Sequence, residues 1–260
     1  MKIAEKELDM QFDEFLELVK KRRSIRRFKP DPVPDEYVEK MIEAARWSPS
    51  GANGQPWEFI IVKDQETKNK MAELWLPHRW EQYFIDHTRV EGVKTVGGLA
   101  NPPKDLPAFK DAPVLIVVCG DRRTYQATVL STHFMIGEGG TGGGYLKNMG
   151  NATYTLHLAA AALGLASQWF SVLEVWGEEL KTLLGVPPML QIHTVVPVGY
   201  PAYEPAPSYR RGFEEIVHHE RYDMSKYRSG DQVIEFIREL RKRTKPSFDQ
   251  GYRTPGKEQS

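Results

Sequence analysis

The sequence predicts an α+β fold, in which a modest mixed or antiparallel sheet is flanked by helices. Three short runs rich in β-branched and aromatic residues, at 57–62, 114–119 and 191–198, are typical of strands. Apolar residues recur at helical spacing before and between them. After residue 200 the chain is rich in Pro, Arg and Tyr, which predicts extended arms that bury little apolar surface by themselves and could pack on a partner subunit.

The helices follow from the spacing of apolar residues along the chain. An amphipathic first helix is predicted over 12–19, and a second one begins after Pro34. The Ala-rich stretch 145–163 predicts a central helix whose small side chains permit close packing. A further helix is expected over 232–241, and a short strand over 166–171.

The stretch 75–110 is polar, aromatic and only weakly periodic. A long insertion of this kind in a compact domain is usually functional or mobile, so we interpret it as a substrate lid. Its aromatic side chains would cover a substrate or, alternatively, pack in the core: Trp75, Trp80, Tyr83 and Phe84. We interpret residues 1–260 as a single domain that ends in a C-terminal arm over 200–260.

The overall composition excludes several classes of protein. The 35 basic and 35 acidic side chains cancel, so no long-range field recruits nucleic acid or an anionic membrane. No run approaches the roughly 20 apolar residues of a membrane span, and the charged N-terminus lacks a signal core. Cys119 is the only cysteine and the seven histidines lack metal-ligand spacing, so we expect neither a disulfide nor a metal site. A cytoplasmic protein acting on a small molecule is the expectation.

Two segments carry side chains suited to an anionic ligand. Basic residues surround Ser24 at the end of the first helix, where paired guanidinium donors and a hydroxyl suit a phosphate. The alternative is an ordinary solvated helix end, which basic residues also favour through the helix dipole. At the other end of the chain, the stretch 199–211 ends in Arg210 and Arg211, and by itself indicates only a surface loop.

The loop 48–57 joins a predicted helix to a predicted strand. Gly51 and Gly54 allow the backbone to approach a ligand closely, and polar side chains offer donors and acceptors. These polar residues are Ser50, Asn53 and Gln55. The alternative is a simple connection between two elements.

Together, these segments resemble the nitroreductase family of FMN enzymes in their order and spacing. The resemblance is carried by Arg-Arg-Ser-Ile-Arg-Arg-Phe at 22–28, by Pro-Ser-Gly-Ala-Asn-Gly-Gln-Pro-Trp at 49–57, and by Pro-Val-Gly-Tyr-Pro at 197–201. It spans roughly residues 12–220. It implies a sheet flanked by helices, and a homodimer with its FMN sites at the subunit interface.

The resemblance also implies roles for the arginine-rich segment. Arg22 and Ser24 would hold the FMN phosphate, a dianion near neutral pH, with Arg23 nearby. Arg26 would approach the pyrimidine end of the flavin, where a cation stabilises the reduced state. Arg210 would be a second phosphate ligand, with Arg211 as the alternative if the register differs by one residue.

The loop and the short strand complete the implied site. Loop residues would contact FMN, in the site of the opposite subunit: Ser50, Gly51, Asn53 and Gln55. On the strand, Trp169, Phe170 and Ser171 would lie near the flavin. In the deiodinase branch of the family a threonine at the place of Ser171 donates to flavin N5, and a hydroxyl there favours one-electron steps. The alternative role for the Ser171 hydroxyl is a hydrogen bond to nearby backbone.

The glycine-rich segment 137–144 matches the G-x-G-x-x-G pattern of dinucleotide-binding folds. The segment before it is a poor strand, however, and no acidic residue lies about 20 positions further on. We interpret it as a loop that leads into the central helix.

The predicted function is electron transfer from NAD(P)H, through FMN, to an organic acceptor such as a nitroaromatic, a quinone or an activated alkene. Three alternatives remain open. One is a specialised branch of the same fold, using Ser171-assisted reductive dehalogenation or oxygen-dependent flavin chemistry. Another is a non-catalytic FMN-binding protein. The third, an RNA-binding module using residues 20–27, is disfavoured by the zero net charge and by the lack of interleaved aromatic residues in that patch.

Overall fold

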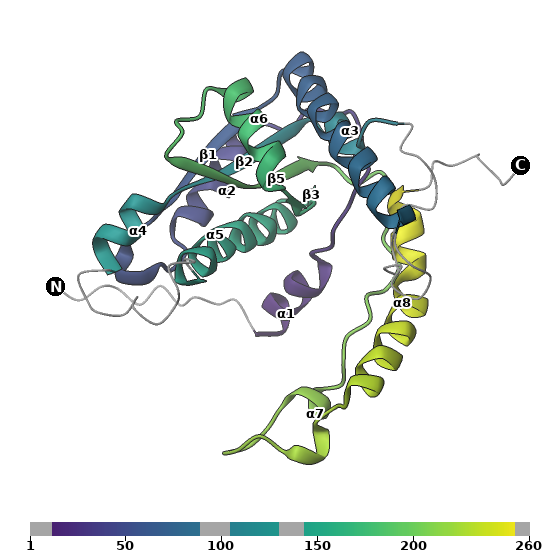
Figure 1. Cartoon of the computed structure of the whole chain (residues 1–260). Helices are drawn as coiled ribbons and strands as arrows, with labels where there is room; N and C mark the ends of the chain where they lie inside the picture. Colours follow the sequence, from purple (N-terminus) through teal and green to yellow (C-terminus); the bar gives the residue numbers. More distant parts are fainter. Residues whose placement is uncertain (1–11, 89–104, 130–142, 253–260) are drawn as a thin grey trace, which may run out of the picture. The chain divides into compact units, whose positions relative to one another are not determined.

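The computed structural model describes residues 12–88, 105–129 and 143–252 (Figure 1). The chain forms two compact units, and the boundary between them falls between Ala202 and Tyr203. The first unit holds the whole sheet and most of the helices. The second unit contains the C-terminal segment.

The sheet has five strands in the order β1-β2-β5-β3, with β4 also paired to β5. Every pairing between named strands is antiparallel. The central strand β2 is buried along its full length, as its run of apolar residues predicted. The strands are β1 (Trp57–Val62), β2 (Val114–Asp121), β3 (Ala166–Ser167), β4 (Phe170–Ser171) and β5 (Leu190–Gly199). The three longer strands are thus confirmed, whereas the predicted strand 166–171 is interrupted at Gln168 and Trp169.

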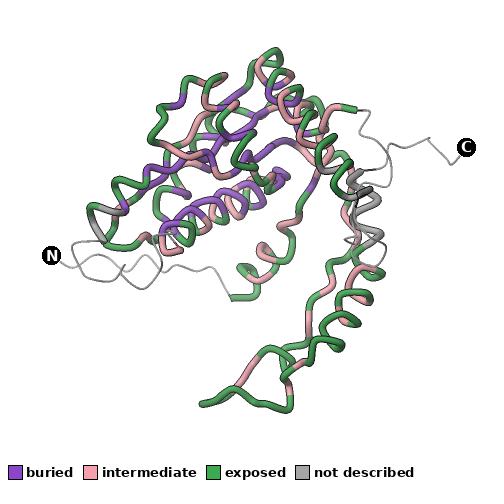
Figure 2. Tube along the Cα trace, in the orientation of Figure 1, coloured by how far each residue is buried: buried purple, intermediate pink, exposed green. Residues whose placement is uncertain are grey.

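Helices cover both faces of the sheet. Alternate residues of β2 point to opposite faces, so this strand contributes to the packing on each. Val118 packs into a core with α2 and α5, whereas Val117 packs into a second core with α3 and α6. Figure 2 shows the buried residues concentrated in the strands and along α5. The helices of this unit are α1 (Phe12–Lys21), α2 (Asp35–Arg46), α3 (Gln65–Thr88), α4 (Arg122–Val129), α5 (Gly143–Ala162) and α6 (Glu174–Leu184). The helices predicted near 12–19, after Pro34 and over 145–163 are confirmed.

Helix α3 differs from the prediction of an irregular insertion that begins at Trp75. It continues through Thr88 with Pro77 inside it. A proline removes one backbone donor and usually ends or kinks a helix, but α3 continues past Pro77. Residues 89–104 of the predicted lid and 137–142 of the glycine-rich loop lie outside the described residues.

The second unit is built around α8 (Gly230–Tyr252), which is longer than the helix predicted over 232–241. Before it come the short α7 (Phe213–Ile216) and a single turn of 3-10 helix, η4 (Met224–Lys226). Cation–π contacts hold the unit together: the guanidinium of Arg228 lies 4.2 Å from the ring centre of Phe236, and that of Arg243 lies 4.7 Å from Tyr209. The C-terminal arm therefore has local packing of its own.

Candidate functional site

The arginine-rich segment, residues 22–28, lies along the edge of the sheet and is joined to it by isolated β-bridges. The backbone nitrogen of Ile25 donates to the carbonyl of Ser167 at 3.0 Å, and Ser24 forms a parallel bridge with Ser167. Further along, Phe28 bridges to Pro201. Ile25 is buried while Ser24 is exposed, so the backbone is anchored and the serine hydroxyl faces outward. This geometry is more specific than the solvated helix end considered above.

Arg22 and Ser24 both retain their capacity to bind a ligand. Arg22 is half-buried, and no carboxylate pairs with its guanidinium within the described parts of the chain. The Ser24 hydroxyl likewise has no hydrogen-bond partner among the described residues. Arg23 and Arg26 are half-buried on the same segment. A half-buried cation without a counter-ion, two residues from an exposed hydroxyl, is suited to an oxyanion.

A buried histidine that the sequence analysis missed lies next to this segment. His157 is on α5 and is 3% exposed, and its Nδ1 atom lies 2.7 Å from the Ser167 hydroxyl. Its ring stacks on Trp169, with ring centres 5.8 Å apart. Burial, reinforced by the positive charge of Arg22, lowers the pKa of His157 to about 4, so the imidazole is neutral at neutral pH. Its Nε2 atom has no hydrogen-bond partner among the residues that the structure describes.

The predicted strand residues divide between the two faces of the sheet. Trp169 is 43% exposed beside His157. Phe170 instead packs into the second core, with its ring centre 4.7 Å from that of Phe109, so only its backbone remains available to a ligand. Ser171 is exposed, and in the described residues its hydroxyl makes no bond to nearby backbone. The hydroxyl of Ser171 is thus available.

The loop before β1 is held on one face of α5. The Gly51 backbone nitrogen donates to the Asn148 side chain at 3.2 Å, and the Asn151 side chain donates to the carbonyl of Pro49 at 3.0 Å. Ser48 donates to the Thr155 hydroxyl at 2.8 Å. Within the loop, the Gln55 nitrogen donates to the Ser50 hydroxyl at 3.0 Å.

Backbone strain is concentrated in this loop. Ala52, Asn53 and Gln55 adopt positive φ angles of 50°, 54° and 43°. Residues other than glycine pay roughly 1 kcal/mol or more each for this conformation, which persists where the surroundings or a function require it. Gly54, in contrast, has an ordinary helical φ of −69°. The strain supports a functional loop over a simple connection.

In a single chain the loop and the arginine-rich segment are not brought together. Within the loop, Gly51 is bonded to Asn148, whereas His157 is bonded to Ser167, the residue that bridges to Ser24. Because an α-helix rises about 1.5 Å per residue, Asn148 and His157 lie about 14 Å apart along α5. The predicted site residues of the first unit therefore form two separate groups.

Arg210 and Arg211 belong to the second unit, where they differ in their partners. Arg211 interacts with Glu215 through both the carboxylate, at 3.4 Å, and the backbone carbonyl, at 2.8 Å. Arg210 contacts only the neighbouring Ser208 hydroxyl and the Tyr209 carbonyl among the described residues. Arg210 thus keeps the more available guanidinium.

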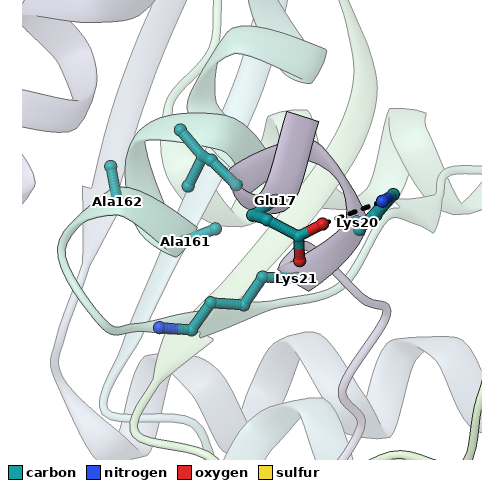
Figure 3. A pocket seen from close by; sticks show the side chains of 6 residues that line it. Glu17, Lys20, Lys21, Ala161 and Ala162 are labelled. Atoms are coloured by element: carbon teal, nitrogen blue, oxygen red, sulfur yellow. Dashed lines mark hydrogen bonds and ion pairs between the residues drawn. The ribbon is translucent and has the colours of Figure 1, made fainter. Parts of the chain in front are cut away.

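A surface hollow of about 540 Å³ lies between the end of α1 and the end of α5 (Figure 3). Its lining includes Lys20 and Lys21, and Lys20 is paired with Glu17 at 2.8 Å.

No group of three potential metal ligands occurs among the described residues. Nor does any described helix combine the length and the apolar composition that a membrane span requires.

Comparisons with known proteins show the family of this chain. The family model "Nitroreductase family" matches residues 19–200. The chain is 30% identical over 208 residues to a NADH dehydrogenase of Thermus thermophilus, covering 76% of this chain and 91% of that protein. It is 32% identical over 209 residues to iodotyrosine deiodinase 1 of Rattus norvegicus, covering 76% of this chain and 66%, just under two thirds, of that protein.

A solved structure extends the likeness to three dimensions. The structure of oxidized iodotyrosine deiodinase bound to FMN and 3-iodo-L-tyrosine matches with a TM-score of 0.60 and 27% identity. The match covers 80% of this chain and 99% of that one. The residues matched by the family model, 19–200, contain the entire sheet, the arginine-rich segment and the strained loop. This chain therefore belongs to the nitroreductase family.

Proposed function

We propose that this protein binds FMN and transfers electrons from NAD(P)H to an organic acceptor such as a nitroaromatic, a quinone or an activated alkene. One observation carries the proposal. Half-buried Arg22 has no carboxylate partner among the described residues and lies two positions from Ser24, whose hydroxyl is available. This pair is suited to a phosphate monoester, and the solved relative named above contains FMN.

The residues present are compatible with the rest of such a cofactor. Arg26 would stabilise negative charge that develops on the pyrimidine end of a reduced flavin. Ser171 would present its hydroxyl, and Trp169 its exposed ring, to the isoalloxazine. Arg210 would supply a second phosphate contact. Bound FMN would itself supply the electron-transfer chemistry, so the protein needs no separate acid–base pair.

We also propose that two copies of the chain form the complete site. Ser50, Gly51, Asn53 and Gln55 are anchored far along α5 from Arg22 and Ser24, so they would serve the site of the other subunit. An exposed stripe on α5 supports this arrangement, because Leu146 is 49% exposed and Tyr154 is 42% exposed. Gly150 lies between them in the sequence, and a Cβ atom added there would meet no atom within 4 Å in the single chain. A stripe of this kind permits close approach of a second helix.

The aromatic cluster on α3 suggests how a flat acceptor would be held. The ring centre of Trp80 lies 5.8 Å from those of both Tyr83 and Phe84, and Phe84 is 58% exposed. Exposed aromatic side chains of this kind suit a planar substrate. In this proposal the segment 75–110 acts as a lid over the substrate.

Reductive dehalogenation is the second candidate. The available hydroxyl of Ser171 and the 32% identity to iodotyrosine deiodinase 1 favour it. Chemistry of this kind would depend on Ser171, whereas hydride transfer from NAD(P)H would not.

The visible spectrum of the purified protein tests the proposal. We expect oxidised-flavin absorption that is lost on anaerobic addition of NAD(P)H and returns on addition of a nitroarene or a quinone. Absorption that persists with NAD(P)H but is lost with a chemical reductant would favour the dehalogenating or the non-catalytic alternative. A protein that cannot be loaded with FMN would refute the proposal.

A further inference from the structure

The buried imidazole of His157 has only one of its two nitrogens in a hydrogen bond. Nδ1 lies 2.7 Å from the Ser167 hydroxyl, while Nε2 has no partner among the described residues. Buried polar atoms are nearly always paired, and an unpaired one costs free energy. An apolar side chain at this position would avoid that cost. The imidazole therefore calls for a functional explanation.

Ser167 connects this imidazole to the arginine-rich segment. Its hydroxyl contacts His157, and its carbonyl accepts the hydrogen bond from the Ile25 nitrogen at 3.0 Å. Its backbone also bridges to Ser24. One serine thus fixes both the ring of His157 and the strand that carries the candidate phosphate ligands.

The positive charge of Arg22 favours one tautomer of the neutral imidazole. The guanidinium is close enough to His157 to lower the pKa of the imidazole, after burial as the larger cause. A neutral imidazole is most stable with a lone pair toward such a cation and its N–H away from it. The tautomer that donates from Nδ1 to the Ser167 hydroxyl carries its lone pair on Nε2.

We infer that His157 positions Arg22 when FMN binds: Nε2, which has no partner among the described residues, would then accept a hydrogen bond from the guanidinium, and the remaining guanidinium donors would hold the FMN phosphate. This role rests on the proposed FMN binding and adds His157 to the residues that support the phosphate site. His157 is a positioning residue, since it acts on the phosphate through Arg22. Arginine presents five donors in a planar fork, so one can be held by the protein while others remain for the phosphate.

Titration of the flavin-free protein with FMN and with riboflavin, followed by flavin fluorescence, tests this inference. Riboflavin lacks the phosphate, so only FMN should sense the orientation of Arg22. We expect His157→Leu to raise the Kd for FMN about tenfold and that for riboflavin less than about twofold. His157→Gln, whose amide oxygen can replace Nε2 as acceptor, should stay within about threefold of the wild type for both flavins.

The control is Thr153→Val, one turn earlier on α5. Thr153 is fully buried and its hydroxyl donates to the Met149 carbonyl at 2.8 Å. The variant therefore loses a buried polar group that does not involve Arg22. We expect the ratio of the two Kd values to remain unchanged in this variant. If His157→Leu does not fold, Ser167→Ala provides the second variant, with a Kd for FMN raised about threefold and that for riboflavin unchanged.

A double-mutant cycle separates positioning from general structural damage. In an Arg22→Ala background, His157→Leu should change the Kd for FMN by less than about twofold, because the group that it positions is gone. An equal loss of affinity for both flavins, or the same tenfold loss without Arg22, would overturn the inference. A wild-type protein that binds no FMN would instead refute the proposed function itself.

Discussion

Arg22 and Ser24 lie two positions apart on a segment whose backbone is bonded to the sheet edge. Arg22 still donates its backbone nitrogen to Leu18 of α1 at 3.1 Å, and Ser24 follows two residues later, so a guanidinium and a hydroxyl close together in the chain can meet one phosphate. We expect Arg22→Ala combined with Ser24→Ala to raise the Kd for FMN at least about hundredfold without changing the far-UV circular dichroism. Undiminished FMN retention would contradict the phosphate assignment.

Lys20 gives a matched control for that pair. It lies at the same helix end, is exposed, and is paired with Glu17 at 2.8 Å. Lys20→Ala removes the same formal charge as Arg22→Ala, and it should change the Kd for FMN less than about threefold, because an exposed charge is largely screened. The comparison separates a directed contact from general electrostatic attraction.

The pKa of His157 leads to a prediction about acid stability. The imidazole has a pKa of about 4 in the folded protein against an ordinary value of 6.5, with burial first and Arg22 second as the causes. The unfolded state therefore binds more protons between these values. The contribution of the neutral ring to the free energy of unfolding is complete above about pH 6.5 and is lost as the pH falls toward 4. It is on the order of 3 kcal/mol.

Chemical denaturation of the flavin-free protein at about pH 7.5 and about pH 4.5 checks this. We expect the free energy of unfolding to fall less steeply with decreasing pH in His157→Leu than in the wild type. The variant should keep part of the slope, because burial, with Arg122 as the second cause, also lowers the pKa of His193 to about 4. An identical slope in the two proteins would show that His157 is not buried as a neutral ring.

At the scale of elements, α5 has two distinct sides. One side anchors the strained loop through Asn148, Asn151 and Thr155. The other carries the exposed residues Leu146 and Tyr154 with Gly150 between them. Glycine in a helix interior costs about 1 kcal/mol relative to alanine, and no contact within the described chain requires it. A close approach by a second α5 would explain it.

Gly150→Leu tests this explanation. A leucine there meets open space in the single chain but would separate two packed helices, so we expect the sedimentation coefficient of the variant to become that of a monomer. The far-UV circular dichroism should remain that of the wild type. Gly230→Leu, at the start of α8, also places a side chain in open space and should leave the oligomeric state unchanged. A Gly150→Leu variant that remains dimeric would place the interface elsewhere.

Elements with one dominant local pattern could be predicted from the sequence, and those shaped by tertiary packing could not. The strand β2 is apolar throughout, and its burial is complete. Helix α3 was not predicted because its apolar residues do not keep to one face, so the stretch shows little helical periodicity. The significance of His157 also lay beyond local pattern. It arises from the contact with Ser167, on a strand that follows the helix.

For the whole molecule, the division into two units raises the question of what the second unit contributes. The family model ends at residue 200, so the segment from Tyr203 onward lies outside the part of the chain that it matches. The resemblance assigns Arg22 and Ser24 to the phosphate, and that assignment stays a prediction. The resemblance leaves Arg210 and Arg211 as alternatives, because the residues that follow, Gly-Phe-Glu-Glu, depart from the pattern that would fix the register.

The partners of the two arginines argue for Arg210. Glu215 accepts from Arg211 through its carboxylate and its carbonyl, and moving Arg211 onto a phosphate would break both contacts. The guanidinium of Arg210 would give up only contacts to its immediate neighbours. We expect Arg210→Ala to raise the Kd for FMN about tenfold and Arg211→Ala less than about threefold, with riboflavin affinity unchanged in both. Fluorescence titration with the two flavins measures this difference. The reverse order would assign the phosphate to Arg211, and no effect from either variant would confine phosphate binding to the arginine-rich segment of the first unit.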